Sequence, residues 1–175
     1  MTSGRWLAGF GRPIALATAL LLVRPGPGGA EILQGQVLDA QTGQPIAGAV
    51  VLGVWSMVGG SSGLPRTNPV AVREVETDAE GRFVLGGPGL EVEVDEESIT
   101  VYRRGYVAWN NLFIFPTSEP RVDTRVPSKI MLDRFPPAQS HRRHVDFISE
   151  ATLGKDDPAT TPKFWKAVRP EYFLP

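Results

Sequence analysis

The chain has 175 residues, a length typical of one domain with a short additional segment. Three of its 18 Lys and Arg residues lie in the first thirty residues, which hold no acid, so residues 31–175 carry 15 bases against 19 acids. This mildly acidic balance argues against nucleic-acid binding, which needs clustered Lys and Arg. The chain has no cysteine, which excludes disulfides, thiolate metal sites and cysteine nucleophiles.

The first thirty residues have the pattern of a secretory signal peptide. Arg5 and Arg12 precede an apolar run, residues 14–23, and small residues ending in Ala30 follow it. A membrane-spanning helix needs about 20 apolar residues, whereas a signal-peptide core takes roughly 7–15. We therefore expect a signal peptide over residues 1–30, cleaved after Ala30, and a periplasmic or secreted mature chain without a transmembrane span. An uncleaved membrane anchor is the alternative.

Residues 31–135 contain short runs typical of β-strands, separated by turn residues. Asp39 is expected to accept hydrogen bonds from turn amides, and Gly81 to supply the left-handed residue of a hairpin. Residues 56–69, rich in Gly, Ser and Pro, predict an exposed loop of unusual length. The expected strands cover residues 32–39, 46–55, 70–77, 82–85, 90–94, 99–103, 107–115 and 129–132.

So many short strands separated by turns predict an all-β, two-layer sandwich, because a parallel sheet would need helices between its strands. The remaining residues, 136–175, form an extension with two expected helices, over residues 138–152 and 163–169. Thr161 and Pro162 are suited to be the N-cap and first residue of the second helix. We expect the apolar side chains of this extension to fold back over the sandwich, and an exposed docking patch is the alternative. They are Phe164, Trp165, Val168, Tyr172, Phe173 and Leu174.

Three blocks together resemble the carboxypeptidase regulatory-like domains, a family of transthyretin-related sandwiches. They are the strand-turn-strand of residues 35–51, the Thr-Asp-Ala-Glu-Gly-Arg-Phe hairpin of residues 77–83, and the strand of residues 99–106, which ends in Gly-Tyr. The resemblance covers roughly residues 32–133. It implies a seven-stranded Greek-key β-sandwich of the prealbumin-like type, with a short helical C-terminal extension, and a role without catalysis.

The chain has two histidines, His141 and His144, which share one face if residues 138–152 are helical. This spacing is compatible with a metal site or with a polar helix face. We favour the polar face, because Arg142 and Arg143 repel a cation and no nearby carboxylate completes a ligand set.

A metal-dependent enzyme on the same scaffold is the alternative reading. Residues 35–39 and 54–55 resemble the opening strands of intradiol ring-cleaving dioxygenases, and that resemblance implies ferric iron held by two tyrosines and two histidines. Here no tyrosine follows in the expected loop, and the histidines lie in the extension. The tyrosines of the chain are Tyr102, Tyr106 and Tyr172.

Two further groups of residues have ligand-binding potential. Tyr106, Trp109 and Asn110 follow a glycine corner, and such side chains at the end of a sandwich can stack on a sugar or grip a peptide, although burial in the core explains them as well. The acidic residues between Glu91 and Glu97 offer oxygen ligands for calcium. We favour a solvated edge strand, whose charges discourage aggregation.

The sequence as a whole predicts a non-catalytic, exported binding or accessory module with no cofactor, in contact with an unidentified protein or cell-envelope component. The alternatives are a metal-dependent enzyme and a carbohydrate-binding accessory domain. The candidate contact residues are Tyr106, Trp109, Asn110, Phe164 and Trp165.

Overall fold

A computed structural model describes residues 32–59, 66–89 and 92–174 of the chain. The signal peptide expected over residues 1–30, with its cleavage after Ala30, lies outside these residues. The strands are β1 (Ile32–Asp39), β2 (Val50–Gly59), β3 (Arg66–Glu76), β4 (Arg82–Gly86), β5 (Glu96–Tyr102), β6 (Trp109–Asn110), β7 (Phe113–Ile114), β8 (Glu119–Pro120) and β9 (Lys129–Leu132). The helices are α1 (His141–Ala151), α2 (Pro162–Val168) and the 3-10 helix η1 (Arg169–Phe173).

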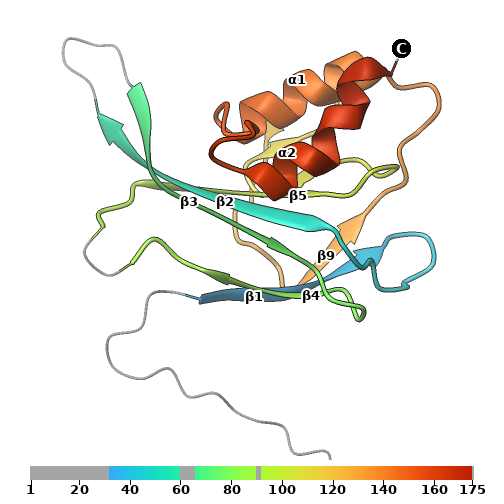
Figure 1. Cartoon of the computed structure of the whole chain (residues 1–175), viewed down its shortest axis with the longest axis horizontal. Helices are drawn as coiled ribbons and strands as arrows, with labels where there is room; N and C mark the ends of the chain where they lie inside the picture. Colours follow the sequence, from blue (N-terminus) through green and yellow to red (C-terminus); the bar gives the residue numbers. More distant parts are fainter. Residues whose placement is uncertain (1–31, 60–65, 90–91, 175) are drawn as a thin grey trace, which may run out of the picture.

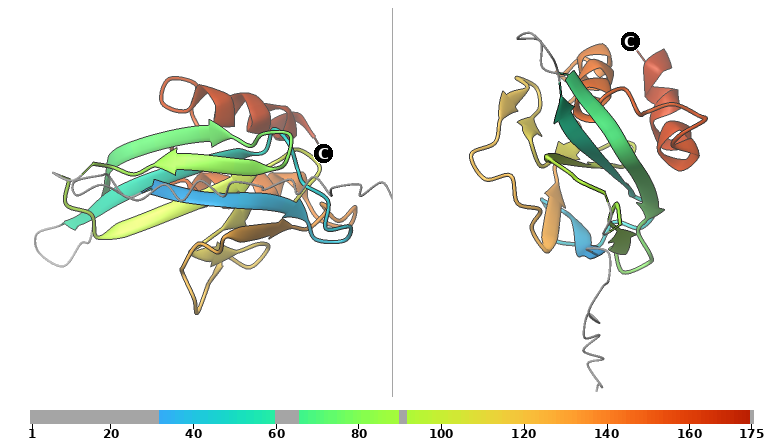
Figure 2. Two further views of the ribbon diagram at one scale, coloured as in Figure 1. Left: turned by 90° about the horizontal axis from the view of Figure 1, so that it is seen from below. Right: turned by 90° about the vertical axis from the view of Figure 1, so that its left-hand side faces the viewer.

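Two sheets and the helices form three layers (Figure 1). One sheet has the strand order β4-β1-β9 and the other β3-β2-β5-β6, while β7 and β8 pair separately. Strand β1 is parallel to β9, and the other pairs are antiparallel. The helices cover the outer face of the β3-β2-β5-β6 sheet, and Figure 2 shows the same layering from two more sides. The prediction of a mostly β protein is confirmed, although the described residues hold nine strands in three sheets and not seven in two.

Alternation along the strands fills the space between the two larger sheets. On β1, Val37 is fully buried while Ile32 is 60% exposed, and on β4, Phe83 and Leu85 point inward while Val84 is 61% exposed. Successive side chains of a strand point to opposite faces, so this period follows directly from the sequence. The buried cluster consists of Val37, Ile46, Ala49, Val51, Trp55, Phe83, Leu85, Ile99, Val101, Ile130 and Leu132.

Strand β2 has apolar side chains on both faces. One face packs against the β4-β1-β9 sheet and the other against the helices. Val51 and Trp55 belong to the cluster between the sheets. The opposite face of the β3-β2-β5-β6 sheet forms a second cluster with the helices, made of Val50, Leu52, Val54, Tyr102, Ala108, Phe147, Ile148, Ala151, Phe164 and Val168. The extension therefore does fold back over the sheet, with Phe164 fully buried, but Phe173 remains 76% exposed.

The second helix begins at the predicted residues, whereas the first, expected from residue 138, begins at His141. The Ser140 hydroxyl accepts a hydrogen bond from the Arg143 N–H at the start of α1, and Pro162 is the first residue of α2 after Thr161. Such residues satisfy or avoid the unpaired N–H groups of a first helical turn. No helix among the described residues is long and apolar enough to cross a membrane.

Four expected segments differ from the structure. The strand expected from residue 46 begins at Val50, because residues 47 and 48 form a turn. Strands β2 and β3 extend into residues 56–69, so the described flanks of the expected loop are paired, while residues 60–65 lie outside the described chain. Residues 92–94 form no strand, and β5 begins at Glu96. The expected strand of residues 107–115 is divided into β6 and β7, because the Asn110 side chain accepts hydrogen bonds from two N–H groups that follow it and turns the chain.

Candidate functional site

Four polar side chains from three elements meet beside the first turn of α1. His141 and His144 lie one turn apart on the helix, Tyr102 is the last residue of β5, and Glu171 belongs to η1. The side chains of His144 and Glu171 are 0% and 4% exposed, whereas that of His141 is 28% exposed. We call these four residues the Glu171 cluster.

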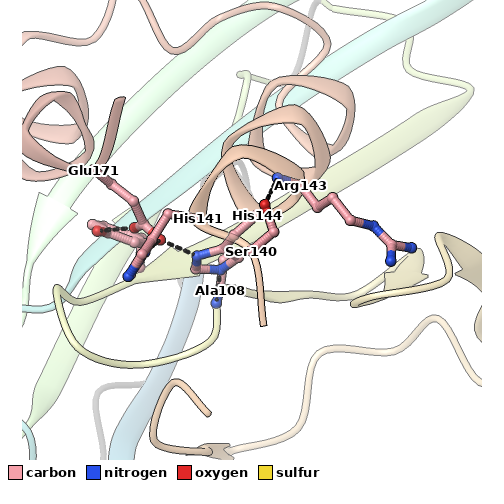
Figure 3. Close-up of polar contacts among 7 residues, drawn as sticks. Ala108, Ser140, His141, Arg143, His144 and Glu171 are labelled. Carbon is pink, nitrogen blue, oxygen red and sulfur yellow. Dashed lines mark hydrogen bonds and ion pairs between the residues drawn. The ribbon is translucent and has the colours of Figure 1, made fainter. Parts of the chain in front are cut away.

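The carboxylate of Glu171 is the centre of the cluster. The Tyr102 hydroxyl donates to Oε2 at 2.5 Å. The Nδ1 atoms of His141 and His144 lie 2.8 Å and 2.6 Å from Oε1 (Figure 3). A buried carboxylate without partners is strongly destabilising, so these three donors make the burial of Glu171 tolerable.

Ala108 determines the tautomer of His144. The backbone N–H of Ala108 donates to His144 Nε2 at 2.8 Å (Figure 3), so Nε2 must present its lone pair. In the neutral ring the proton then lies on Nδ1, which donates to Glu171. Both ring nitrogens of His144 are therefore occupied in holding three segments together.

The contacts also set the charge states of the carboxyl and phenol groups. Burial alone would raise the pKa of Glu171, but the hydrogen bonds from His144, Tyr102 and His141 lower it below its ordinary value. Burial, together with the adjacent Glu171 carboxylate, raises the pKa of the Tyr102 hydroxyl. Glu171 is thus held as an anion, and Tyr102 as a neutral hydrogen-bond donor.

The same hydrogen bonds bear on metal binding. A histidine binds a metal through the lone pair of a ring nitrogen, but in His144 Nδ1 carries the proton and the Nε2 lone pair faces the Ala108 N–H. Within residues 32–59, 66–89 and 92–174, no group of three or more His, Asp or Glu side chains could hold a metal ion. Tyr102, His141 and His144 thus converge on a carboxylate, and their arrangement does not fit the ferric site that the dioxygenase resemblance implies.

The expectation of a polar helix face at His141 and His144 was wrong for His144. The helix packs against β5 and buries this side chain completely. The carboxylate that the sequence did not place beside the histidines comes from Glu171, 27 and 30 residues further along the chain. No local spacing could indicate this, because the contact depends on how α1 and η1 pack.

Tyr106 and Trp109, two candidate contact residues, each have a ring covered on one side by an arginine. The Tyr106 hydroxyl donates to Asp39 Oδ2 at 2.9 Å, and the Arg134 guanidinium lies 5.6 Å from the ring centre. The Arg121 guanidinium lies 5.4 Å from the Trp109 ring. Both rings also pack against the core between the sheets and are half-buried.

The structure places the other candidate contacts differently. Asn110 is fully buried, and its amide donates to Ser98 and Thr100 side chains and so holds β5 to β6. Phe164 is fully buried as well, so neither residue can touch a partner in this structure. Trp165 is half-buried and remains available at the surface.

Two carboxylates of the acidic stretch between Glu91 and Glu97 accept hydrogen bonds from strand β2. Asp95 Oδ2 accepts a hydrogen bond from the Val58 N–H at 2.7 Å, and Glu97 Oε1 accepts one from the Trp55 indole at 2.9 Å. Glu91 lies outside the described residues. The two carboxylates therefore fix the end of the β2–β5 pair, a role that needs no calcium ion.

Comparisons with known proteins give limited similarity. No protein-family model and no curated protein matches the chain. A 3-chlorocatechol 1,2-dioxygenase from Rhodococcus opacus 1CP is 16% identical, with a TM-score of 0.36, and the match covers 62% of this chain and 61% of that one. A 9R-lipoxygenase from Cyanothece PCC8801 is 13% identical, with a TM-score of 0.31, and the match covers 95% of this chain and 27% of that one. The chain spans less than two thirds of either structure, and TM-scores this low identify neither a fold nor an activity.

Proposed function

We propose that the chain is a non-catalytic binding or accessory module that acts outside the cytoplasm through contact with a protein or envelope component. The supporting observation is the state of the Glu171 cluster. Its side chains are those that general acid–base chemistry would use, and they are occupied in attaching η1 to α1 and β5.

A catalytic base needs an accessible lone pair aimed at a substrate. The lone pair of His144 faces the Ala108 N–H and is buried. His141 stacks on Phe135 with ring centres 4.4 Å apart, so its ring forms part of a packed wall. These contacts favour a structural role for the cluster, and with it a binding function for the protein.

The strand arrangement supports the finer fold proposal, a prealbumin-like Greek-key sandwich related to the carboxypeptidase regulatory-like domains. The two larger sheets together contain seven strands, in the orders β4-β1-β9 and β3-β2-β5-β6. The first strand lies in one sheet and the next two in the other, and the chain then returns to pair β4 with β1. Such crossing between sheets is typical of Greek-key sandwiches.

Export is proposed from the sequence alone. The basic residues Arg5 and Arg12, the apolar run of residues 14–23 and the small residues before Glu31 support a cleaved signal peptide. The absence of cysteine means that folding outside the cytoplasm requires no disulfide formation.

Two measurements on the protein test this function. Crosslinking in intact cells, followed by purification of the tagged chain, is expected to capture a reproducible protein or envelope component. Metal analysis of the purified protein is expected to find well below one iron, zinc or calcium ion per chain. Stoichiometric iron that resists chelators, and that Tyr102→Phe removes, would show a metal-dependent enzyme instead.

A further inference from the structure

A hollow of about 380 Å³ lies where α2 meets η1. Its walls are formed by Trp165 from α2 and by Pro170 and Phe173 from η1, and Lys166 and Arg169 complete the lining. The volume is at the small end of the range for ligand pockets and is suited to one or two side chains. Apolar walls beside two cationic groups form a surface that can recognise a partner by both its shape and its charge. We call this surface the α2–η1 hollow.

The hollow is held in shape by the contacts of Glu171 and Tyr172, the two residues that precede Phe173. Glu171 is fixed by the cluster described above. The Tyr172 hydroxyl donates to Asp156 Oδ2 at 2.6 Å, and its ring lies 5.5 Å from that of Trp165. The main chain that carries Phe173 is thus anchored, although Phe173 itself is 76% exposed. A surface that is ordered before binding loses less entropy when a partner arrives.

Among the described residues, the two cationic side chains of the hollow, Lys166 and Arg169, form no ion pair. Asp156 accepts a hydrogen bond from the Tyr172 hydroxyl, and Asp157 accepts hydrogen bonds from the N–H groups of Ala159 and Thr160, so these two carboxylates bond to groups other than Lys166 and Arg169. On a chain whose residues 31–175 are acidic overall, this local positive charge complements an acidic partner.

We infer that the α2–η1 hollow binds a peptide segment of a partner protein in which carboxylates flank an exposed leucine or aromatic side chain. The apolar side chain would enter against Trp165 and Phe173, and the carboxylates would pair with Lys166 and Arg169. This inference rests on the proposed binding function and names the surface and the chemistry of the partner.

A protein segment fits this surface better than an anionic lipid bilayer does. Peripheral membrane binding needs several cations together with apolar side chains that project beyond them, or a second anchor. Here two cations line a concave surface, and one of the two aromatic side chains, Trp165, is half-buried. A concave surface of this kind is suited to bind a side chain of a partner protein.

The test uses the purified chain and a fluorescein-labelled peptide in which glutamate alternates with leucine and phenylalanine. Fluorescence anisotropy is expected to show saturable binding. The double reversal of Lys166→Glu with Arg169→Glu should weaken it by about tenfold or more, and Phe173→Ala should weaken it several-fold. The matched control, Arg82→Glu with Lys129→Glu, makes the same charge change on β4 and β9, the sheet that the helices do not cover. Its affinity for the peptide should stay within about twofold of that of the parent protein.

Three results would overturn the inference. They are equal loss of binding in the control variant, equal binding of a peptide with alanine in place of leucine and phenylalanine, and capture by phosphatidylglycerol vesicles that depends on Lys166 and Arg169. A photo-crosslinker at Phe173, compared with one at Met131 on the other sheet, separates this inference from the proposed function. If cells yield a partner only from Met131, the binding function stands and the α2–η1 hollow is the wrong surface. If neither position yields one and the peptide does not bind, both proposals fail.

Discussion

Asp39 and Glu171 are carboxylates buried on opposite sides of the β3-β2-β5-β6 sheet, and each is held by several donors. Asp39 lies beside the core between the sheets, where burial acts to raise its pKa but the hydrogen bonds and charge around it lower the pKa to about 2. The donors are the Thr42 and Gln41 N–H groups, the Tyr106 hydroxyl and the Arg134 guanidinium. The sequence predicts the two turn amides, because they follow Asp39 directly, but it gives no information on Tyr106 and Arg134.

The low pKa of Asp39 makes stability depend on pH in a defined window. The folded-state pKa of about 2 lies below the ordinary value of 3.8, so the carboxylate stabilises the fold fully above pH 3.8 and loses this effect as the pH falls toward 2. We expect Asp39→Asn to be less stable than the parent protein at neutral pH and to lose less stability between these two pH values. Urea unfolding at a series of pH values measures both effects.

Asp123 provides the control for this experiment. Its pKa is also about 2, but its main partner is Arg125, two residues away on the exposed surface. A pair this close along the chain can form in unfolded molecules too, and exposed pairs contribute little. Asp123→Asn is therefore expected to leave the pH dependence almost unchanged, and an effect equal to that of Asp39→Asn would contradict the assignment.

At the scale of elements, the strands with a clear period or β-branched run were predictable from the sequence. Strand β9 has the expected limits, and β4 is one residue longer than expected. The short strands β6, β7 and β8 were not predictable, since two residues carry no period. The buried amide of Asn111, directly after β6, attaches this part of the chain to β5: it accepts a hydrogen bond from the Ile99 N–H and donates to the carbonyl groups of Glu97 and Thr124.

Two turn glycines provide a matched comparison. Gly81 and Gly43 both have a positive φ, of 72° and 68°. A Cβ on Gly81 would lie 2.5 Å from the carbonyl oxygen of Val37, whereas a Cβ on Gly43 would meet nothing within 4 Å. We expect Gly43→Ala to cost about 1 kcal/mol from backbone conformation alone. Gly81→Ala should cost roughly 2 kcal/mol more, because the turn before β4 must move away from β1. Urea unfolding of both variants tests this, and equal losses would show that the close approach is relieved without cost.

At the scale of the whole molecule, the decisive feature is the outer face of the β3-β2-β5-β6 sheet. The sequence shows that β2 is apolar on both faces and that the extension is rich in aromatic residues, so a contact between them was predictable. It does not show which aromatic residues enter. Phe164 and Phe173 belong to the same short segment, yet one is fully buried and the other is 76% exposed. The choice depends on the turn from α2 into η1 and on the anchoring of Glu171.

This difference in burial predicts that two similar substitutions change the stability by very different amounts. Phe164→Ala leaves a cavity between α2 and the sheet and should reduce the free energy of unfolding by about 3–5 kcal/mol. Phe173→Ala removes an exposed ring and should change it by no more than about 0.5 kcal/mol. Thermal and urea unfolding provide the measurement. A large loss from Phe173→Ala would mean that the ring supports the fold and is not reserved for a partner.

The separation of 69 residues between Tyr102 and Glu171 has a consequence for biogenesis. During synthesis, the strands emerge long before Glu171, whose carboxylate attaches the helical layer to them. Until then Leu52 and its neighbours remain uncovered on the outer sheet face, which makes the nascent protein a natural client for chaperones. A chain truncated before this point would leave that face uncovered, and proteases that recognise exposed apolar surface would degrade it.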